Sequence, residues 1–216
     1  MQLASTSTLA APVPPFAAFV SQLQGASNPL GGDAETSADC GVAASLMALW
    51  STGAAPRPTT AQGIDQAFVS ARLLATERID RTEPLFPKDI DRLFTQVKVP
   101  HAMVQSGTSL LDDVRRGATA VVLGSATGAT PQGATGNADG AGTWYERAAQ
   151  LGLPGVPDGH AVTITGYQAS DDSFTVMDPL AQAPFRAPAR EVSTFIDNLK
   201  SWGYPAGVTV SPTPER

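Results

Sequence analysis

The chain contains 216 residues, 42% of them hydrophobic, and it carries a formal net charge of −6 at pH 7. This length and apolar content are typical of a globular protein with a substantial core, and they exclude an intrinsically disordered chain. The acidic balance argues against nucleic acid or an anionic membrane surface as the main partner. No run approaches the roughly 18 apolar residues of a membrane-spanning helix.

Residues 1–32 contain no charged side chain and are rich in Ala, Ser, Thr and Pro. The stretch lacks the basic start and unbroken apolar centre of a Sec signal peptide, and the spacing of apolar residues over 16–23 predicts a short helix. We interpret it as a flexible N-terminal arm. The alternative is the leader of a specialised bacterial secretion system, which would make the protein secreted or translocated. Residues 33–216 show no repeat or linker and are predicted to form a single domain.

Cys40 is the only cysteine, so it can form neither an intrachain disulfide nor a multi-cysteine zinc site. A helix is predicted to begin beside it, with Ser37 or Asp39 as cap and its end at Thr52-Gly53. Backbone N–H groups at a helix N-terminus stabilise a thiolate, which favours a reactive cysteine over a buried small hydrophobic residue or an incidental thiol. The core-facing residues of this helix are expected to be Ala43, Leu46, Met47 and Trp50.

Helices and short strands are predicted to follow in alternation. Helical spacing indicates one helix over 59–79, capped by Thr59 or Thr60, and another that opens at Phe86-Pro87 and continues to Val97. The remaining elements of this part are a strand at 102–104, a helix at 109–116 that ends at Gly117, and an apolar strand at 118–123 suited to the centre of a sheet.

The segment 124–159 differs in composition from the rest of the domain. It is rich in Gly, Ala and Thr, and Trp144 and Tyr145 are its prominent side chains. Connections of this length inside a compact domain are usually functional loops or disordered segments. Because the segment ends directly before His160, we expect it to overhang the site, either as a substrate-contacting lid or as a tolerated surface insertion.

The last part of the chain is predicted to contain a hairpin, a helix and a strand. Two strands at 160–167 and 174–177 are joined by a polar turn. An amphipathic helix then covers 191–202, and a short edge strand follows at 208–210. Helices therefore come first and mainly antiparallel strands later, which indicates an α+β fold.

The hairpin carries one of the two histidines of the chain at its start and a carboxylate at its end. His160 opens the first strand and Asp178 closes the second. In an antiparallel hairpin the two share a face only if paired residue numbers add up to an even total, with Asp178 opposite His160 or opposite Val162. The alternative role for Asp178 is that of a turn residue before proline. The pattern suggests no carboxylate for His101, so His160 is preferred as the base.

A nucleophilic thiol needs a base to hold it as thiolate and a third group to orient that base. Cys40 on a helix, His160 on a strand and Asp178 on the next strand supply these groups, in the order of a papain-type thiol hydrolase. The two histidines and the one cysteine are not closely spaced, which argues against a metal site. The sequence also contains no glycine-rich phosphate-binding loop between a strand and a helix. We therefore expect no metal and no organic cofactor.

The oxyanion of the reaction needs hydrogen-bond donors. The backbone N–H of Cys40 is one candidate, and a side-chain amide upstream usually supplies the second. The available amides are those of Asn28 and Gln24, with Gln22 further away.

Three segments of the chain, 39–47, 159–162 and 176–179, resemble the bacteriocin-processing peptidases and their papain-like relatives. The resemblance extends over roughly Asp39 to Trp202. It implies a papain-like cysteine protease fold, in which an N-terminal helical part carries the nucleophile and packs on an antiparallel sheet that carries the histidine and the aspartate.

The resemblance also implies roles for individual residues. Cys40 is the nucleophile, His160 the general base and acid, and Asp178 the orienting carboxylate. The family usually carries a Gln for the oxyanion hole at a position that is Ala34 in this chain.

The leading hypothesis is therefore a cysteine peptidase that cleaves a peptide or isopeptide bond in a protein or peptide substrate through an acyl-enzyme. An extension of this hypothesis is delivery outside its producer as a bacterial effector. One alternative keeps the same residues but transfers the acyl group to an amine, as transglutaminase-like relatives do. Another is an amidase that acts on cell-wall peptide. The non-enzyme alternative is a degenerate module that binds a protein partner through its cleft. The sequence leaves the oligomeric state open.

Overall fold

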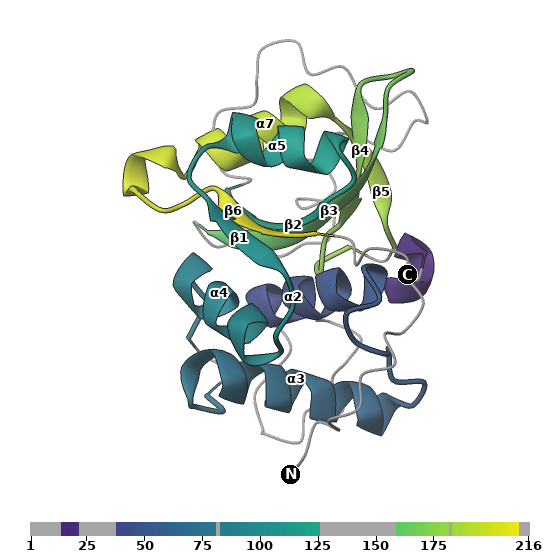
Figure 1. The fold of residues 1–216 in the computed structure, drawn as a ribbon, viewed down its shortest axis with the longest axis vertical. Helices are drawn as coiled ribbons and strands as arrows, with labels where there is room; N and C mark the ends of the chain where they lie inside the picture. Colours follow the sequence, from purple (N-terminus) through teal and green to yellow (C-terminus); the bar gives the residue numbers. More distant parts are fainter. Residues whose placement is uncertain (1–13, 22–37, 81–82, 126–158, 182, 212–216) are drawn as a thin grey trace.

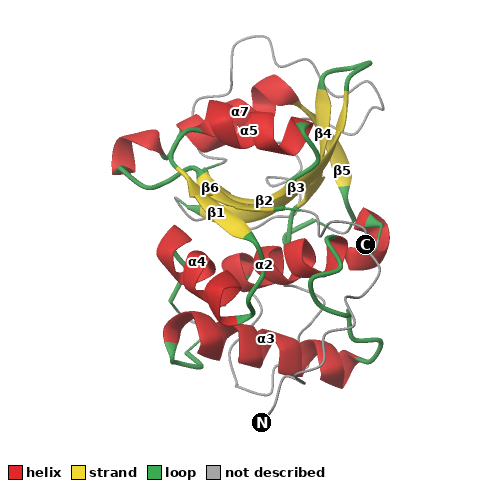
Figure 2. Ribbon diagram, viewed as in Figure 1, coloured by secondary structure: helices red, strands yellow, loops and turns green. Residues whose placement is uncertain are grey.

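The computed structural model describes residues 14–21, 38–80, 83–125, 159–181 and 183–211. A six-stranded sheet forms the middle layer of the molecule, and helices cover both of its faces (Figures 1 and 2). Each face packs against its helices through a hydrophobic cluster of its own. The α+β class predicted from the sequence is confirmed, because every strand pairing of the sheet is antiparallel.

The sheet has the strand order β1-β6-β2-β3-β4-β5. Its central strand β2 is buried along its whole length, as the apolar run in the sequence predicts. The strands are β1 (His101–Val104), β2 (Thr119–Gly124), β3 (His160–Gln168), β4 (Ser173–Met177), β5 (Phe185–Pro188) and β6 (Gly207–Val210).

One prediction about the sheet is wrong, and one strand was not predicted. Strand β6 is not an edge strand, because it lies between β1 and β2 and is fully buried. Gly207 permits this position, since a Cβ there would lie only 2.2 Å from the Val121 carbonyl oxygen. Strand β5 was not predicted, because its four residues are few and include Pro188. It forms an edge of the sheet, where proline is tolerated.

Three helices, α2 (Cys40–Ser51), α3 (Ala61–Thr76) and α4 (Pro87–Gln96), form the layer drawn below the sheet in Figure 1. Helix α3 begins at the predicted cap, where the Thr60 hydroxyl accepts a hydrogen bond from the Gly63 N–H at 3.1 Å. Helix α2 is buried from Cys40 to Trp50, on all sides rather than along one stripe. It lies between the sheet and the other two helices, and a helix in such a position is apolar all round.

The opposite face of the sheet carries α5 (Gly107–Arg115) and α7 (Ala189–Asp197). The single helix predicted over 191–202 is in fact α7 followed by a short 3₁₀ helix, η2 (Lys200–Trp202). Residues of α7 pack in the cluster beneath α5, whereas Leu199 packs in the cluster on the other face of the sheet. The chain therefore leaves the α-helical conformation between the end of α7 and Leu199.

Residues 14–21 are anchored to the domain, which differs from the flexible arm expected for this stretch. Helix α1 (Pro15–Ala18) is shorter than predicted, because Phe19 already has an extended backbone. Ala18 and Ser21 are buried, and the Ser21 hydroxyl donates a hydrogen bond to the Pro179 carbonyl oxygen at 3.0 Å. The N-terminal segment thus contacts the residue that follows Asp178.

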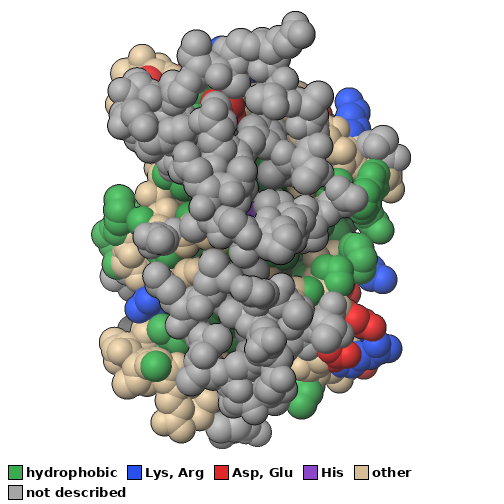
Figure 3. All heavy atoms as spheres, turned by 180° about the vertical axis from the view of Figure 1, so that it is seen from behind, with side chains coloured by type: hydrophobic (Ala, Val, Ile, Leu, Met, Phe, Trp, Pro, Cys, Tyr) green, Lys and Arg blue, Asp and Glu red, His purple; other side chains and the backbone are tan. Residues whose placement is uncertain are grey.

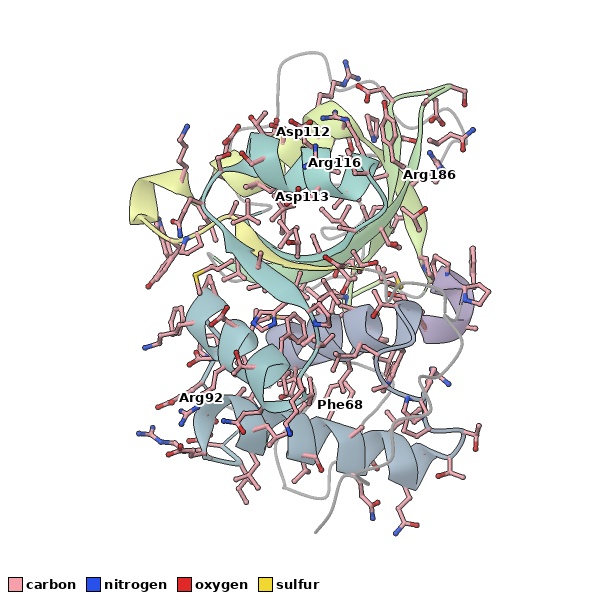
Figure 4. The ribbon with its side chains drawn as sticks, viewed as in Figure 1. Phe68, Arg92, Asp112, Asp113, Arg116 and Arg186 are labelled. Atoms are coloured by element: carbon pink, nitrogen blue, oxygen red, sulfur yellow. The ribbon has the colours of Figure 1, made fainter. Side chains whose placement is uncertain are left out.

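Most charged side chains among the described residues lie on the outer surface of the helices and strands. On the rear face, acidic and basic groups lie next to one another (Figure 3). Arg92 is paired with Glu77 and Arg116 with Asp113. No helix among the described residues is both long and apolar enough to cross a membrane. Figure 4 contrasts Phe68, among the helices, with charged residues on the outside, namely Arg92, Asp112, Asp113, Arg116 and Arg186.

Candidate active site

Cys40 is the first residue of α2 and is buried, with 8% of its surface exposed. The chain beside it is packed closely, since a Cβ at Gly41 would lie 2.8 Å from the Leu85 Cβ. Asp39 occupies the N-cap position, but its side chain makes no capping hydrogen bond to the helix and is instead bound by Arg72. The first turn of α2 therefore keeps its backbone N–H groups for other partners.

The pairing of β3 with β4 brings His160 and Asp178 to the same face of the sheet. Thr163 pairs with Met177, so the same register places Asp178 opposite Val162, one of the two arrangements predicted from the sequence. The register changes by one residue at Gly166, which has a φ of 59°. If the register found beyond this bulge applied along the whole hairpin, paired residue numbers would add up to an odd total, and Asp178 would lie on the face opposite His160.

The His160 imidazole links the other two residues. Its Nε2 atom lies 2.7 Å from Asp178 Oδ1, and the two side chains are almost fully buried. The Leu180 N–H donates to the same carboxylate oxygen at 2.8 Å and so fixes its orientation. The imidazole also makes a side-chain hydrogen bond to Cys40. Because Nε2 faces Asp178, the remaining ring nitrogen, Nδ1, is the one available to the thiol.

The electrostatics of the three residues favour charge separation. Burial raises the pKa of the Cys40 thiol, but the hydrogen bond and positive charge of His160, with the Ala161 and Gly41 N–H groups, outweigh it, so the thiol pKa is lowered overall. Burial lowers the pKa of His160, but the charge and hydrogen bond of Asp178, followed by those of Cys40, raise it to about 10. Both shifts favour the pair of a thiolate and an imidazolium over the neutral pair.

The described residues hold this pair in place from several elements. The Thr163 hydroxyl on β3 donates to the Ala44 carbonyl oxygen of α2 at 2.6 Å, so helix and strand are joined close to the thiol. No group of three His, Cys, Asp or Glu side chains suited to a metal ion occurs in the part of the chain that the structure describes.

The other histidine lies apart from this site. His101 Nδ1 is 2.7 Å from the Val99 carbonyl oxygen, and Nε2 is 3.3 Å from Asp91 Oδ1. It therefore has a carboxylate neighbour that the sequence pattern does not suggest, because Asp91 is on α4. The other candidates fall outside the described residues: the oxyanion candidates Asn28, Gln24 and Gln22, the position of Ala34, and the loop residues Trp144 and Tyr145.

Sequence reasoning missed two residues that shape the site. Arg72 lies on the buried face of α3, in one stripe with Phe68 and Ala75, and its place in that stripe is the signal that could have identified it. Gly166 corrects the register of the hairpin, but a single glycine within an apolar strand gives only a general indication of a bulge.

Comparison with known proteins identifies a similar fold. No family model matches the chain, and no curated protein matches its sequence. Among solved structures, it is similar to that of a provisionally assigned C39-like peptidase from Bacillus anthracis, with a TM-score of 0.53 and 15% sequence identity. The match covers 91% of this chain and 95% of that protein. At this identity the likeness shows the fold alone.

Proposed function

We propose that the chain is a thiol hydrolase of the cysteine peptidase kind, which cleaves a peptide or isopeptide bond. The observation that carries the proposal is the position of the His160 imidazole, hydrogen-bonded to the Cys40 thiol and 2.7 Å from Asp178. A fold similar to that of a C39-like peptidase supports the same conclusion. A buried thiol that served packing alone would gain nothing from a neighbouring histidine that stabilises its charge.

In the proposed reaction, the Cys40 thiolate attacks the substrate carbonyl carbon and forms a tetrahedral intermediate. The protonated His160 then gives its proton to the nitrogen of the leaving amine, the carbon–nitrogen bond breaks, and a thioester remains on Cys40. His160 next takes a proton from water, whose oxygen attacks the thioester, and the thiolate leaves. Asp178 holds the imidazole in one orientation and stabilises its positive charge through both steps.

The negative charge that develops on the substrate oxygen needs donors at the start of α2. The first backbone N–H groups of a helix have no partner within the helix and point along its axis. The Cys40 N–H is the donor that we assign to the oxyanion, while the Gly41 N–H contacts the sulfur. Removing one such donor costs about 2.7–4 kcal/mol of transition-state stabilisation in other enzymes, so this geometry is essential to the rate.

The proposal is tested by labelling Cys40 with iodoacetamide from pH 4 to pH 9 and by incubating the protein with a fluorogenic peptide library. Because Cys40 is the only cysteine, all labelling reports on this site, and Cys40→Ser is the matched control. We expect the labelling rate to reach half its plateau below the ordinary thiol value of about 8.5, and peptide cleavage to require Cys40.

A labelling midpoint at or above the ordinary thiol value would overturn the proposal, since the thiol would then be protonated under working conditions. A low midpoint without cleavage of any peptide in the library would retain a reactive thiolate but favour the acyl-transfer reaction, which is detected by adding a primary amine and recovering the amide product. Cleavage that persists in Cys40→Ser would assign the activity to a contaminant and would also reject the proposal.

A further inference from the structure

Arg72 is a charged residue that the proposed reaction does not use, although it is only 2% exposed. It lies on α3 and reaches across to the residues just before Cys40. Its Nε and Nη2 atoms both donate to Asp39 Oδ1, at 3.2 and 2.8 Å, and Nη2 also donates to the Ala38 carbonyl oxygen at 3.1 Å. Nη1 donates to the carbonyl oxygens of Asp80 and Glu83, both at 2.8 Å.

All the donors of the guanidinium are therefore occupied in one place. Burying an ion pair costs desolvation free energy, which is offset only where hydrogen bonds satisfy every polar group of the pair. Charge-assisted hydrogen bonds as complete as these also fix the relative positions of the groups that they join. Apolar side chains such as Leu or Met would fill the same space without that cost. The ion pair therefore indicates that the Asp39 carboxylate has to be held in position and its negative charge balanced by Arg72.

Asp39 directly precedes Cys40 in the sequence and is the N-cap residue of the helix that Cys40 opens. We propose that Arg72 is a positioning residue for Cys40: by binding Asp39 and the Ala38 carbonyl it fixes the first turn of α2 and cancels the negative charge that would otherwise oppose the thiolate. This inference rests on the proposed function, because it concerns the ionisation of the nucleophile. It adds a residue of α3 to a site built from α2, β3 and the end of β4.

The charged groups around the start of α2 lie on two sides of it. His160 on β3 is the cation that contacts the sulfur, and Asp178 acts behind it. Asp39 and Arg72 form a pair on the side of α3. If Arg72 is removed, Asp39 loses this cation in a buried environment, where charge interactions are screened less than in water. Like charges nearby disfavour ionisation, so the thiolate would become harder to form.

The test compares four variants by the midpoint of the iodoacetamide labelling profile and by thermal melting. In Arg72→Met we expect the midpoint to rise by about one pH unit relative to wild type. In Asp39→Asn, which leaves Arg72 uncompensated, the midpoint falls. In the double variant Arg72→Met/Asp39→Asn it returns close to the wild-type value, and in Arg72→Lys, which keeps the charge, it stays near wild type.

Melting temperature separates this effect from a merely structural one. All four variants lower it to some degree, but only the charge explanation predicts shifts of opposite sign in the two single variants and their cancellation in the double. Arg78→Met is the matched control, because Arg78 pairs with Glu83 on the surface, with 66% of its side chain exposed. It should change neither readout measurably.

A double variant whose midpoint stays as high as that of Arg72→Met would overturn the inference. If Arg72→Met does not fold, Asp39→Asn decides alone, since a midpoint that is unchanged or raised contradicts the proposed role of the charge. A wild-type midpoint below the ordinary thiol value, together with no response to any of these substitutions, rejects Arg72 as a positioning residue and leaves the peptidase proposal intact. A wild-type midpoint at the ordinary value rejects the peptidase proposal itself.

Discussion

The two histidines of the chain stand in similar local settings and have different chemistry. His160 opens β3 and His101 opens β1, and each has an aspartate within 3.3 Å of its Nε2 atom, Asp178 in the first case and Asp91 in the second. His160 is almost fully buried and contacts the only thiol of the chain. His101 is partly exposed, and its other ring nitrogen lies against the Val99 carbonyl oxygen.

A histidine–carboxylate pair therefore does not by itself make a site. An exposed pair is screened by water and contributes little. In a buried pair the electrostatic interaction is screened less, and it shifts the pKa of a third group that contacts the other ring nitrogen. The position of the pair relative to the start of α2, rather than the pair as such, therefore distinguishes His160.

Replacing each histidine by alanine gives the largest expected contrast. In His160→Ala the thiol loses the cation that lowers its pKa. The midpoint of iodoacetamide labelling should therefore rise to about 8.5 or above, and peptide hydrolysis should fall by about 10²–10⁴-fold, the usual contribution of a general acid–base group. His101→Ala is the matched control and should change neither quantity. Equal effects of the two substitutions would mean that His101 also serves the site and would remove the contrast.

The two aspartates provide the next test. The charge and hydrogen bond of Asp178 are the largest causes that raise the pKa of His160 to about 10. In Asp178→Asn that pKa falls toward its ordinary 6.5, so at pH above about 7 the imidazole loses its proton and no longer stabilises the thiolate. The labelling midpoint of Cys40 should then rise by about one unit or more, less than in His160→Ala.

Asp91→Asn, beside His101, should leave the labelling profile at its wild-type position. An unchanged midpoint in Asp178→Asn, measured in protein whose circular dichroism is that of wild type, would show that the carboxylate does not act on the thiol through His160.

The same contrast shows how much the sequence could predict. A lone cysteine at a helix start, a histidine at a strand start and an aspartate after the next strand were identified from residue type and spacing, because each signal is local. The sequence left two antiparallel registers of β3 and β4 open as those in which the two side chains share a face, and the structure shows one of them. Local patterns were enough for these residues.

What could not be predicted depends on contacts between distant parts of the chain. The place of β6 between β1 and β2 and the pairing of Asp91 with His101 both join residues from different elements. The same is true of Arg72, which lies 33 residues from Asp39 in the sequence. The stripe on α3 indicates that Arg72 is buried, but no pattern within one helix or strand identifies its partner. Tertiary packing decides these pairings.

Gly166 distinguishes the strand of His160 from the strand of His101, which pairs with β6 without a register shift. Its φ of 59° is in the left-handed region, so Gly166→Ala should destabilise the protein by about 1–2 kcal/mol. Any relaxation of the bulge also moves Asp178 relative to His160. Urea unfolding measures the first effect, and the labelling profile measures the second.

Gly159→Ala is the control for Gly166→Ala. It adds the same methyl group beside His160, but a Cβ there meets no atom of the described residues within 4 Å. A cost for Gly159→Ala equal to that of Gly166→Ala would show that the bulge is not the source of the effect.

The smallest expected effect concerns the segment that packs behind Asp178. The Ser21 hydroxyl is buried and donates to the Pro179 carbonyl oxygen, so Ser21→Ala leaves that oxygen without this donor and should cost about 0.5–1.5 kcal/mol of unfolding free energy. On the side of His101 the comparable hydroxyl is that of Thr95, which is exposed and 3.4 Å from Nε2; Thr95→Ala should stay within about 0.5 kcal/mol of wild type.

Urea unfolding of both variants measures this difference, and labelling of Cys40 tells what the Ser21 hydrogen bond does. If it only anchors residues 14–21, stability falls and the labelling midpoint stays in place, because Asp178 is still held by the Leu180 N–H. A midpoint that rises in Ser21→Ala would instead show that the N-terminal segment helps to position the carboxylate, and the structures that support His160 would then extend from α1 to the end of β4.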